Sequence, residues 1–405
     1  MGWAPTSFRS GCSMPNEQAA LWRMPAIRKL LMVSLLGFTS FDLTLSSLPS
    51  WAVSGGASIG AAGLVTAVFL LVTVLIQMVV PALVARIGAG RVLALGLLAL
   101  GSPAPLCAVT HDLRWLVVIS TVRGCGFAIL TVVGTFLTFS LAPAGRHGES
   151  VGLYGLVLAI PSLLAVPTGV ALTEGGLFGW AAVLAGAPSL AVPLALSLGR
   201  ATAVATVADG HHQVVGHRAA VLGVLSPTLV LLAVTIAAGG VLTVLPIYHP
   251  SGQLATVALL VMGAAAAVAR WRVGAMADRV TGPWLLPVFV LITVLGTGVL
   301  ALGLLVDAGA GTYAALLLAA AVFGAGQGAV ENLSQVNAFA RAGASRASTA
   351  SAMWNAGFDA GIGLGAFAVG AISATVIGFP GTLAGCAVLI ALTVPLAVSS
   401  SRAAL

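Results

Sequence analysis

Residues 30–53 read LLMVSLLGFTSFDLTLSSLPSWAV, an apolar run with one acidic residue, Asp42, near its middle. At about 1.5 Å per residue, a helix of this length crosses the hydrocarbon layer of a bilayer, which is about 30 Å thick. A charge at that depth costs about 2.5–3.5 kcal/mol to insert, so it normally faces a bundle interior or a water-filled cavity. The run therefore predicts a membrane-spanning helix whose carboxylate has a function.

The composition of the chain excludes a soluble globular protein. Of its 405 residues, 59% are hydrophobic and only 7% are charged, whereas a soluble domain carries about 25% charged residues. The apolar runs are long and unbroken, which excludes a β-barrel, because barrel strands alternate polar and apolar residues. The predicted fold class is an all-α membrane protein.

Apolar runs bounded by charges, Gly or Pro predict twelve spans in two six-helix bundles. The spans are expected near residues 30–53, 58–84, 91–110, 115–141, 150–173, 178–199, 221–246, 252–275, 283–306, 313–339, 349–373 and 379–399. The expected domains are an N-terminal segment 1–29, a bundle 30–199, a central loop 200–220, a bundle 221–399 and a tail 400–405.

The basic residues predict the orientation of the chain. With twelve spans, most of the 17 Lys and Arg residues fall on the side that carries both termini, and Arg114 lies in a loop on the other side. The positive-inside rule then places both termini in the cytoplasm. This rule also accounts for the net charge of +7, so we expect no nucleic-acid partner. Lys29 is the only lysine, a bias typical of GC-rich bacterial genomes, and we expect a bacterial inner-membrane protein.

The two halves of the sequence repeat each other. Residues 123–128 (RGCGFA) align with residues 323–328 (FGAGQG), and Arg146 aligns with Arg346 at the same offset. Internal repeats of this kind are typical of secondary transporters, whose substrate site lies between the repeats near the midplane of the membrane.

Residues 274–282 read GAMADRVTG and resemble the G-x-x-x-D-R-x-G signature of the major facilitator superfamily. The twelve spans, the repeat and the central loop support the same resemblance. It implies that the glycine lets two helices pack closely and that the acid and arginine bridge helix ends and latch one conformation. The resemblance assigns this latch to three residues: Gly274, Asp278 and Arg279.

The equivalent stretch of the first half, residues 81–91 (PALVARIGAGR), has lost the first glycine and, at Ala85, the acid. It therefore predicts a weakened second latch. The residues assigned to it are Arg86, Gly88 and Arg91. The alternative is that all these arginines serve only to orient the chain in the membrane.

Arg123 resembles the intramembrane arginine that the same family links to proton coupling. Arg123 and Asp42 both lie about 18 Å from the cytoplasmic face, and the family fold puts their helices on one cavity. We hypothesise that the two are coupled, directly or through water, so that withdrawal of Arg123 lets Asp42 bind a proton. The alternative is a static buried ion pair.

The second half offers further candidates. Asp359 lies about 15 Å into its span and is expected to bind a proton or substrate, or else to hydrogen-bond a neighbouring helix. Asn355 lies one turn away on the same face. Gln327 is expected to line the cavity, whereas a solvated helix end explains Glu331 better. The candidate cavity residues are Asp42, Arg123, Gln327, Glu331, Asn355 and Asp359.

Several signatures are absent from the sequence. It has no Walker loop, no HExxH and no Ser/His/Asp order, so we expect no enzyme activity, no cofactor and no metal. Residues 166–169 (VPTG) partly resemble the G-P-x-x-G element of proton-driven antiporters in the family.

The sequence thus predicts a proton-coupled secondary transporter, an H⁺ antiporter that exports a small amphipathic organic compound by alternating access. We expect it to work as a monomer in the lipid bilayer. One alternative is an uptake symporter for a small metabolite. Another is a non-transporting membrane sensor or assembly partner on the same fold.

Overall fold

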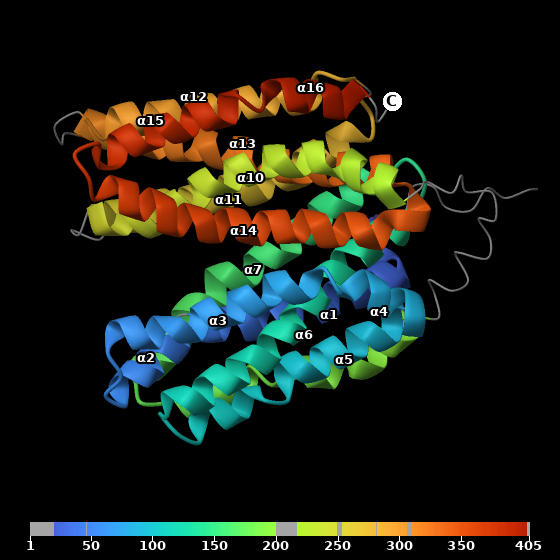
Figure 1. Ribbon diagram of the computed structural model, residues 1–405, viewed down its shortest axis with the longest axis vertical. Helices are drawn as coiled ribbons and strands as arrows, with labels where there is room; N and C mark the ends of the chain where they lie inside the picture. The colour runs from blue at the N-terminus through green and yellow to red at the C-terminus, as the bar shows by residue number, and fades with distance from the viewer. Residues whose placement is uncertain are drawn as a thin grey trace, which may run out of the picture.

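The computed structural model describes residues 20–45, 47–199, 217–248, 253–280, 282–305 and 310–402, which form helices and short connections with no strand among them (Figure 1). The N-half comprises η1 (Leu21–Arg23), α1 (Pro25–Leu45), α2 (Ser47–Ser54), α3 (Ile59–Gln77), α4 (Val80–Ile87), α5 (Ala89–Gly101), η2 (Ala104–Ala108), α6 (Leu113–Ser140), α7 (His147–Glu174), α8 (Phe178–Leu184), η3 (Ala187–Ala191) and a last helical stretch over 192–199. The C-half comprises α10 (His217–Tyr248), α11 (Gln253–Ala277), α12 (Leu285–Gly303), α13 (Ala310–Ala342), η4 (Ala344–Arg346), α14 (Ala347–Ser373), α15 (Gly378–Ala391) and α16 (Val394–Arg402).

The predicted number of spans is confirmed. Among the described residues, 11 helical segments are long and apolar enough to cross a membrane, and α3 with α4 makes the twelfth if this bent pair counts as one span. The pair bends by 54° between Gln77 and Val80, and Pro81 lies in the first turn of α4, where a proline fits because the N–H that it lacks would have no partner within the helix. Most of the predicted central loop, residues 200–216, lies outside the described residues.

The internal repeat is visible in the backbone. Arg146 and Arg346 both precede a long helix, α7 and α14, and have nearly equal φ values of −128° and −123°. Gly124 of α6 packs against the backbone of α3, and Gly324 of α13 packs against the backbone of α11. The aligned positions therefore occupy the same places in the two halves.

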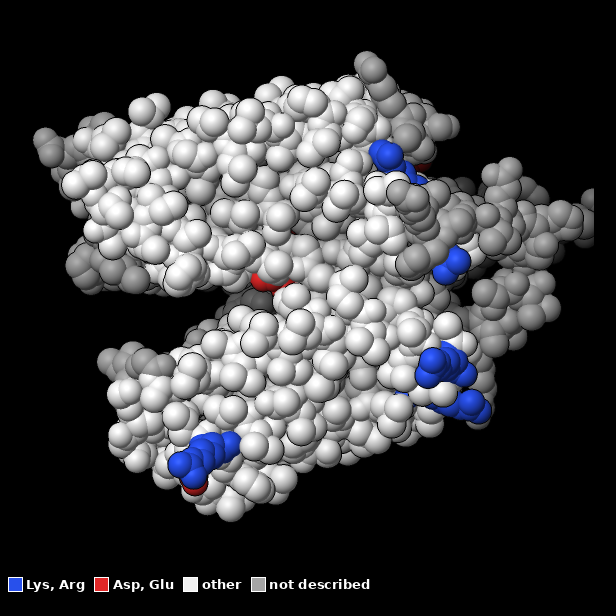
Figure 2. All heavy atoms as spheres, viewed as in Figure 1, with Lys and Arg blue, Asp and Glu red and all other residues white. Residues whose placement is uncertain are grey.

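The two halves meet along one end of the molecule. Helix α7 of the N-half packs against α11, and α14 of the C-half packs against α3 and α6 (Figure 1). We call the end where α7 begins and α11 finishes the closed end. Figure 2 shows that the halves touch there, at the right, and are separated by a wedge-shaped opening at the left, which we call the open end. An acidic side chain is visible where the opening meets the contact between the halves.

Candidate functional site

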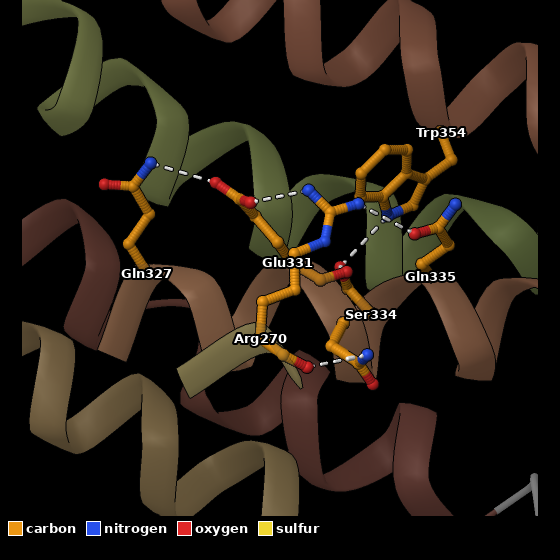
Figure 3. Close-up of polar contacts among 7 residues, drawn as sticks. Arg270, Gln327, Glu331, Ser334, Gln335 and Trp354 are labelled. Carbon is orange, nitrogen blue, oxygen red and sulfur yellow. Dashed lines mark hydrogen bonds and ion pairs between the residues drawn. The ribbon is translucent and has the colours of Figure 1, made fainter. Parts of the chain in front are cut away.

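A buried ion pair joins α11 and α13 toward the closed end of the C-half (Figure 3). Arg270 Nη1 donates to Glu331 Oε2 at 3.0 Å, and Nη2 donates to Gln335 Oε1 at 3.2 Å. The guanidinium carbon lies 5.8 Å from the ring centre of Trp354, a distance typical of a cation–π contact. The two charged side chains are only 11% and 7% exposed, so each depends on the other for its neutralisation.

The spacing of polar residues on α13 builds this cluster. Gln327, Glu331 and Gln335 are four residues apart, so their side chains lie along one face of the helix. Gln327 Nε2 donates to the second carboxylate oxygen, Oε1 of Glu331, at 2.9 Å. The interpretation of Glu331 as a solvated helix end is therefore wrong, because α11 covers it and supplies Arg270 as its partner.

Helix α7 of the N-half closes over the ion pair. A Cβ atom at Gly155 would lie 2.9 Å from Arg270 Cζ and closer still to Nε, so only glycine lets α7 rest on the guanidinium. Asn332 Nδ2 donates to the carbonyls of Arg270 and Gly148, both at 3.1 Å, and so links α13 to both helices. Separation of α7 from α11 would therefore uncover the pair.

The predicted latch residue Asp278 connects the halves. Its Oδ1 accepts from the N–H of Gly148 at 2.8 Å and its Oδ2 from the N–H of Glu149 at 2.7 Å. These groups lie in the first turn of α7, where N–H groups lack partners within the helix and the helix dipole favours an anion. Gly274 packs directly against Gly148, and Arg279 is exposed.

The matching positions of the N-half make no such contact. Arg86 and Arg91 are exposed and form no hydrogen bond or ion pair with any described residue. Gly88 has a φ of +86° and forms the turn between α4 and α5. Ala85 has no acceptor to offer α14, which begins without a side-chain cap at Arg346.

Asp42 lies between α1 and α7 and is 3% exposed. Its hydrogen-bond partner among the described residues is Ser162, whose Oγ donates to Oδ2 at 3.2 Å. An ionised carboxylate that is buried with a single neutral partner costs several kcal/mol, and binding of a proton removes this cost. The position of Asp42 is therefore suited to a group that takes up and releases protons.

Arg123 is not paired with Asp42. Its Nε donates to the carbonyl of Leu100 at 3.1 Å, and its Nη2 donates to the carbonyl and hydroxyl of Ser40 at 3.1 and 3.2 Å. Among the described residues no ion pair joins Arg123 to a carboxylate. Arg123 contacts Ser40, two residues before Asp42, and residues two apart on a helix point about 200° away from each other, so Asp42 faces α7 instead.

Asp359 bridges the halves at α3 and α14. Gln77 Nε2 donates to its Oδ2 at 2.7 Å and to Thr131 Oγ1 at 3.2 Å. Nearer to the closed end, Ser351 of α14 donates to the carbonyl of Val132 in α6 at 2.6 Å. Asn355 donates back to the Ser351 carbonyl at 2.8 Å, so it orients a contact between the halves.

The sequence profile of the Major Facilitator Superfamily matches residues 30–366. The chain belongs to the major facilitator superfamily. No curated protein sequence matches it.

Solved structures of this superfamily have the same fold at low sequence identity. The structure of the human organic anion transporter MFSD10 is 15% identical, with a TM-score of 0.72 over 92% of this chain and 100% of the other. The Escherichia coli fucose:proton symporter FucP is 13% identical, with a TM-score of 0.69 over 94% and 99%. The proton:xylose symporter XylE is 15% identical, with a TM-score of 0.68 over 91% and 94%.

Three contact residues of this major facilitator protein escaped the sequence reasoning: Arg270, Gln77 and Ser162. Arg270 was counted only as an orienting charge, although the polar residues spaced by four on α13 indicated a face that needs a polar partner. Gln77 and Ser162 are neutral and isolated in apolar runs, and no sequence signal distinguished them.

Through Asp278, acidification is expected to favour the closed form, in which α7 rests on α11, because the protonated carboxyl is less costly to bury. Burial raises the pKa of the Asp278 carboxyl above its ordinary value of 3.8, more than the N–H groups of Glu149 and Gly148 lower it. The carboxyl regains its ordinary pKa where α7 and α11 separate, so the closed form binds the proton more tightly. The closed population should therefore rise as the pH falls toward 3.8.

The variant Asp278→Asn should lose this part of the pH dependence. The measurement is the distance between spin labels at Ala85→Cys and Ala340→Cys, two exposed positions of opposite halves, between pH 7 and pH 4. His147 and Glu149, which also face Asp278, are the same in both proteins, so the difference isolates this carboxyl. An equal pH dependence in both would contradict the expectation.

Proposed function

We propose that this major facilitator protein is a proton-coupled secondary transporter that exports a small amphipathic organic compound in exchange for protons. The observation that carries the proposal is Asp42, a buried carboxylate at the junction of α1 and α7 whose hydrogen-bond partner among the described residues is the neutral Ser162. Its proton occupancy changes the charge inside the N-half, and α7 is the helix that closes over the C-half. A proton on Asp42 and the position of α7 are thus linked.

We propose that alternating access depends on two contacts between the halves. The contact of α7 with α11 includes the bonds of Asp278, and the contact of α14 with α3 and α6 includes the bonds of Asp359 and Ser351. When both contacts open, the cavity between the halves would face the other side of the membrane. We propose that Asp359, which loses Gln77 when the halves separate, is the second proton-binding group.

The orientation is part of the proposal. The excess of basic residues on the side with both termini supports a cytoplasmic closed end in a bacterial inner membrane.

Pro161 and Pro167 lie inside the continuous helix α7, and the VPTG element with Pro167 supports exchange of substrate for protons. The second candidate is proton symport, favoured by the structural likeness to the fucose:proton and proton:xylose symporters.

The test is flux into proteoliposomes under an imposed pH gradient, after a ligand-stability screen has identified a compound that binds the purified protein. We expect Asp42→Asn to lower proton-driven accumulation at least about tenfold and to retain exchange of labelled for unlabelled compound, because a permanently neutral side chain uncouples the proton. Asp112→Asn, in an exposed cap of α6, is the matched control and should transport normally. Proton-driven accumulation by Asp42→Asn at the wild-type rate would contradict the proposal.

The direction of coupling comes from the same experiment. Export by antiport requires that protons and compound move in opposite directions, whereas symport requires that they move together. A pH change inside the vesicles on addition of the compound distinguishes the two.

A further inference from the structure

The guanidinium of Arg123 carries a charge that the protein leaves unbalanced. Arg123 is 1% exposed. Of its five N–H groups, one on Nε and two on Nη2 have acceptors in Leu100 and Ser40, whereas those on Nη1 have none among the described residues. The acceptors it does have are neutral.

In the part of the chain that the structure describes, no side chain forms an ion pair that supplies the missing negative charge. Asp42, the acidic residue nearest in the sequence to Ser40, points to Ser162 of α7. Cys107 is close enough to interact electrostatically with Arg123, but an ordinary thiol is mostly neutral at pH 7. A buried charge is costly unless it is paired, so an anion bound from solution would stabilise this guanidinium.

A small cavity adjoins Arg123 between α1, α3 and α6. Its volume is about 20 Å³. Three hydroxyl-bearing residues line it beside Arg123, namely Ser120, Thr44 and Thr66. The apolar residues that complete its wall are Phe41, Leu45, Leu48, Val65 and Phe69. Such a volume holds one water molecule or one small ion, far less than an organic substrate needs.

We propose that this cavity binds a chloride ion as the counter-ion of Arg123. A monovalent anion neutralises one guanidinium, whereas a dianion such as sulfate would leave a net negative charge buried. The available donors are the two N–H groups of Nη1 and the hydroxyls of Ser120 and Thr66, which make no hydrogen bond with any described residue. The site goes beyond the proposed transport function, because it needs no substrate and no proton gradient.

The experiment is thermal unfolding of the purified full-length protein in detergent, with sodium chloride replaced by sodium gluconate at constant ionic strength. A ligand that binds only the folded protein raises the unfolding midpoint with the logarithm of its concentration once the site is nearly filled. We expect this dependence for chloride and bromide and none for gluconate or sulfate.

The decisive variant is Ser120→Asp. Residue 120 lies three positions before Arg123 on α6 and lines the same cavity, so its carboxylate would replace the ion. We expect this variant to lose the chloride dependence and to be as stable in gluconate as the wild type is in chloride. Arg123→Gln should also lose the dependence. Arg114→Gln, an exposed arginine of the same helix, should keep it.

The proposal would be overturned by three results. The first is a wild-type midpoint that is equal in chloride and gluconate, as expected if the cavity holds only water. The second is equal stabilisation by sulfate, as expected for a general salt effect. The third is a chloride dependence that persists in Ser120→Asp. This variant tests the chloride site even if Arg123→Gln does not fold. None of these results bears on proton-driven flux, so the chloride site and the transport function are tested independently.

Discussion

Replacing Arg270 by glutamine is expected to lower the free energy of unfolding by about 3–5 kcal/mol. The change leaves the carboxylate of Glu331 buried, with Gln327 as its remaining hydrogen-bond donor, at 2.9 Å. It also removes the cation from the face of Trp354. Reversible unfolding of the purified protein by sodium dodecyl sulfate measures the difference.

A double variant separates the buried charge from the packing of the arginine. In Arg270→Gln with Glu331→Gln both charges are gone, and we expect most of the lost stability to return. Arg272→Gln is the matched control, because Arg272 lies two residues further along α11 and is exposed; its effect should stay within about 0.5 kcal/mol. A double variant as unstable as Arg270→Gln would show that the ion pair is not the source of the effect.

Gly152→Ala is expected to shift the protein away from the closed form by about 5- to 150-fold. A Cβ at this position would lie 2.7 Å from the carbonyl oxygen of Arg270 and 2.9 Å from the Cα of Trp271, backbone atoms that have no room to yield. Overpacking of this kind costs about 1–3 kcal/mol, and each 1.4 kcal/mol changes an equilibrium constant about tenfold. The clash exists only while α7 rests on α11.

The label pair at Ala85→Cys and Ala340→Cys reports this shift as a longer distance between the halves. Gly263→Ala is the matched control: it makes the same substitution in α11, at a position with nothing within 4 Å of the added Cβ. We expect its distance distribution to equal that of the parent protein. The same result for Gly152→Ala would mean that α7 and α11 do not separate when the closed end opens.

Much of the architecture was predictable because it depends on properties that a sequence displays directly. The length of the apolar runs fixes the number of spans, and the repeat fixed the equivalence of positions such as Arg146 and Arg346. The motif assigned Asp278 to a latch. Its partners, two N–H groups of α7 in the N-half, could not be predicted, because they depend on how the two halves pack.

The sequence predicts that the helices of Arg123 and Asp42 lie together, but the predicted partner of Arg123 is wrong. Arg123 of α6 does contact α1, at Ser40 and not at Asp42. The rotation of each helix about its axis depends on packing between helices, and a difference of two residues turns a side chain to the opposite face. For the same reason the partner of Glu331 could not be named from the sequence: α11 carries both Arg270 and Arg272, and only the packing of the helices shows that Arg270 is the one that turns inward.

The loss of the acid at Ala85 has a consequence for the order in which the closed end comes apart. The seam between α7 and α11 has a charged cap at Asp278 and close glycine contacts, whereas the seam between α4 and α14 has no such cap. Opening should therefore begin at the α14 edge and pivot about α7 and α11, which separate last. The closed end would then open along one side first, beside the helix that begins at Ala347.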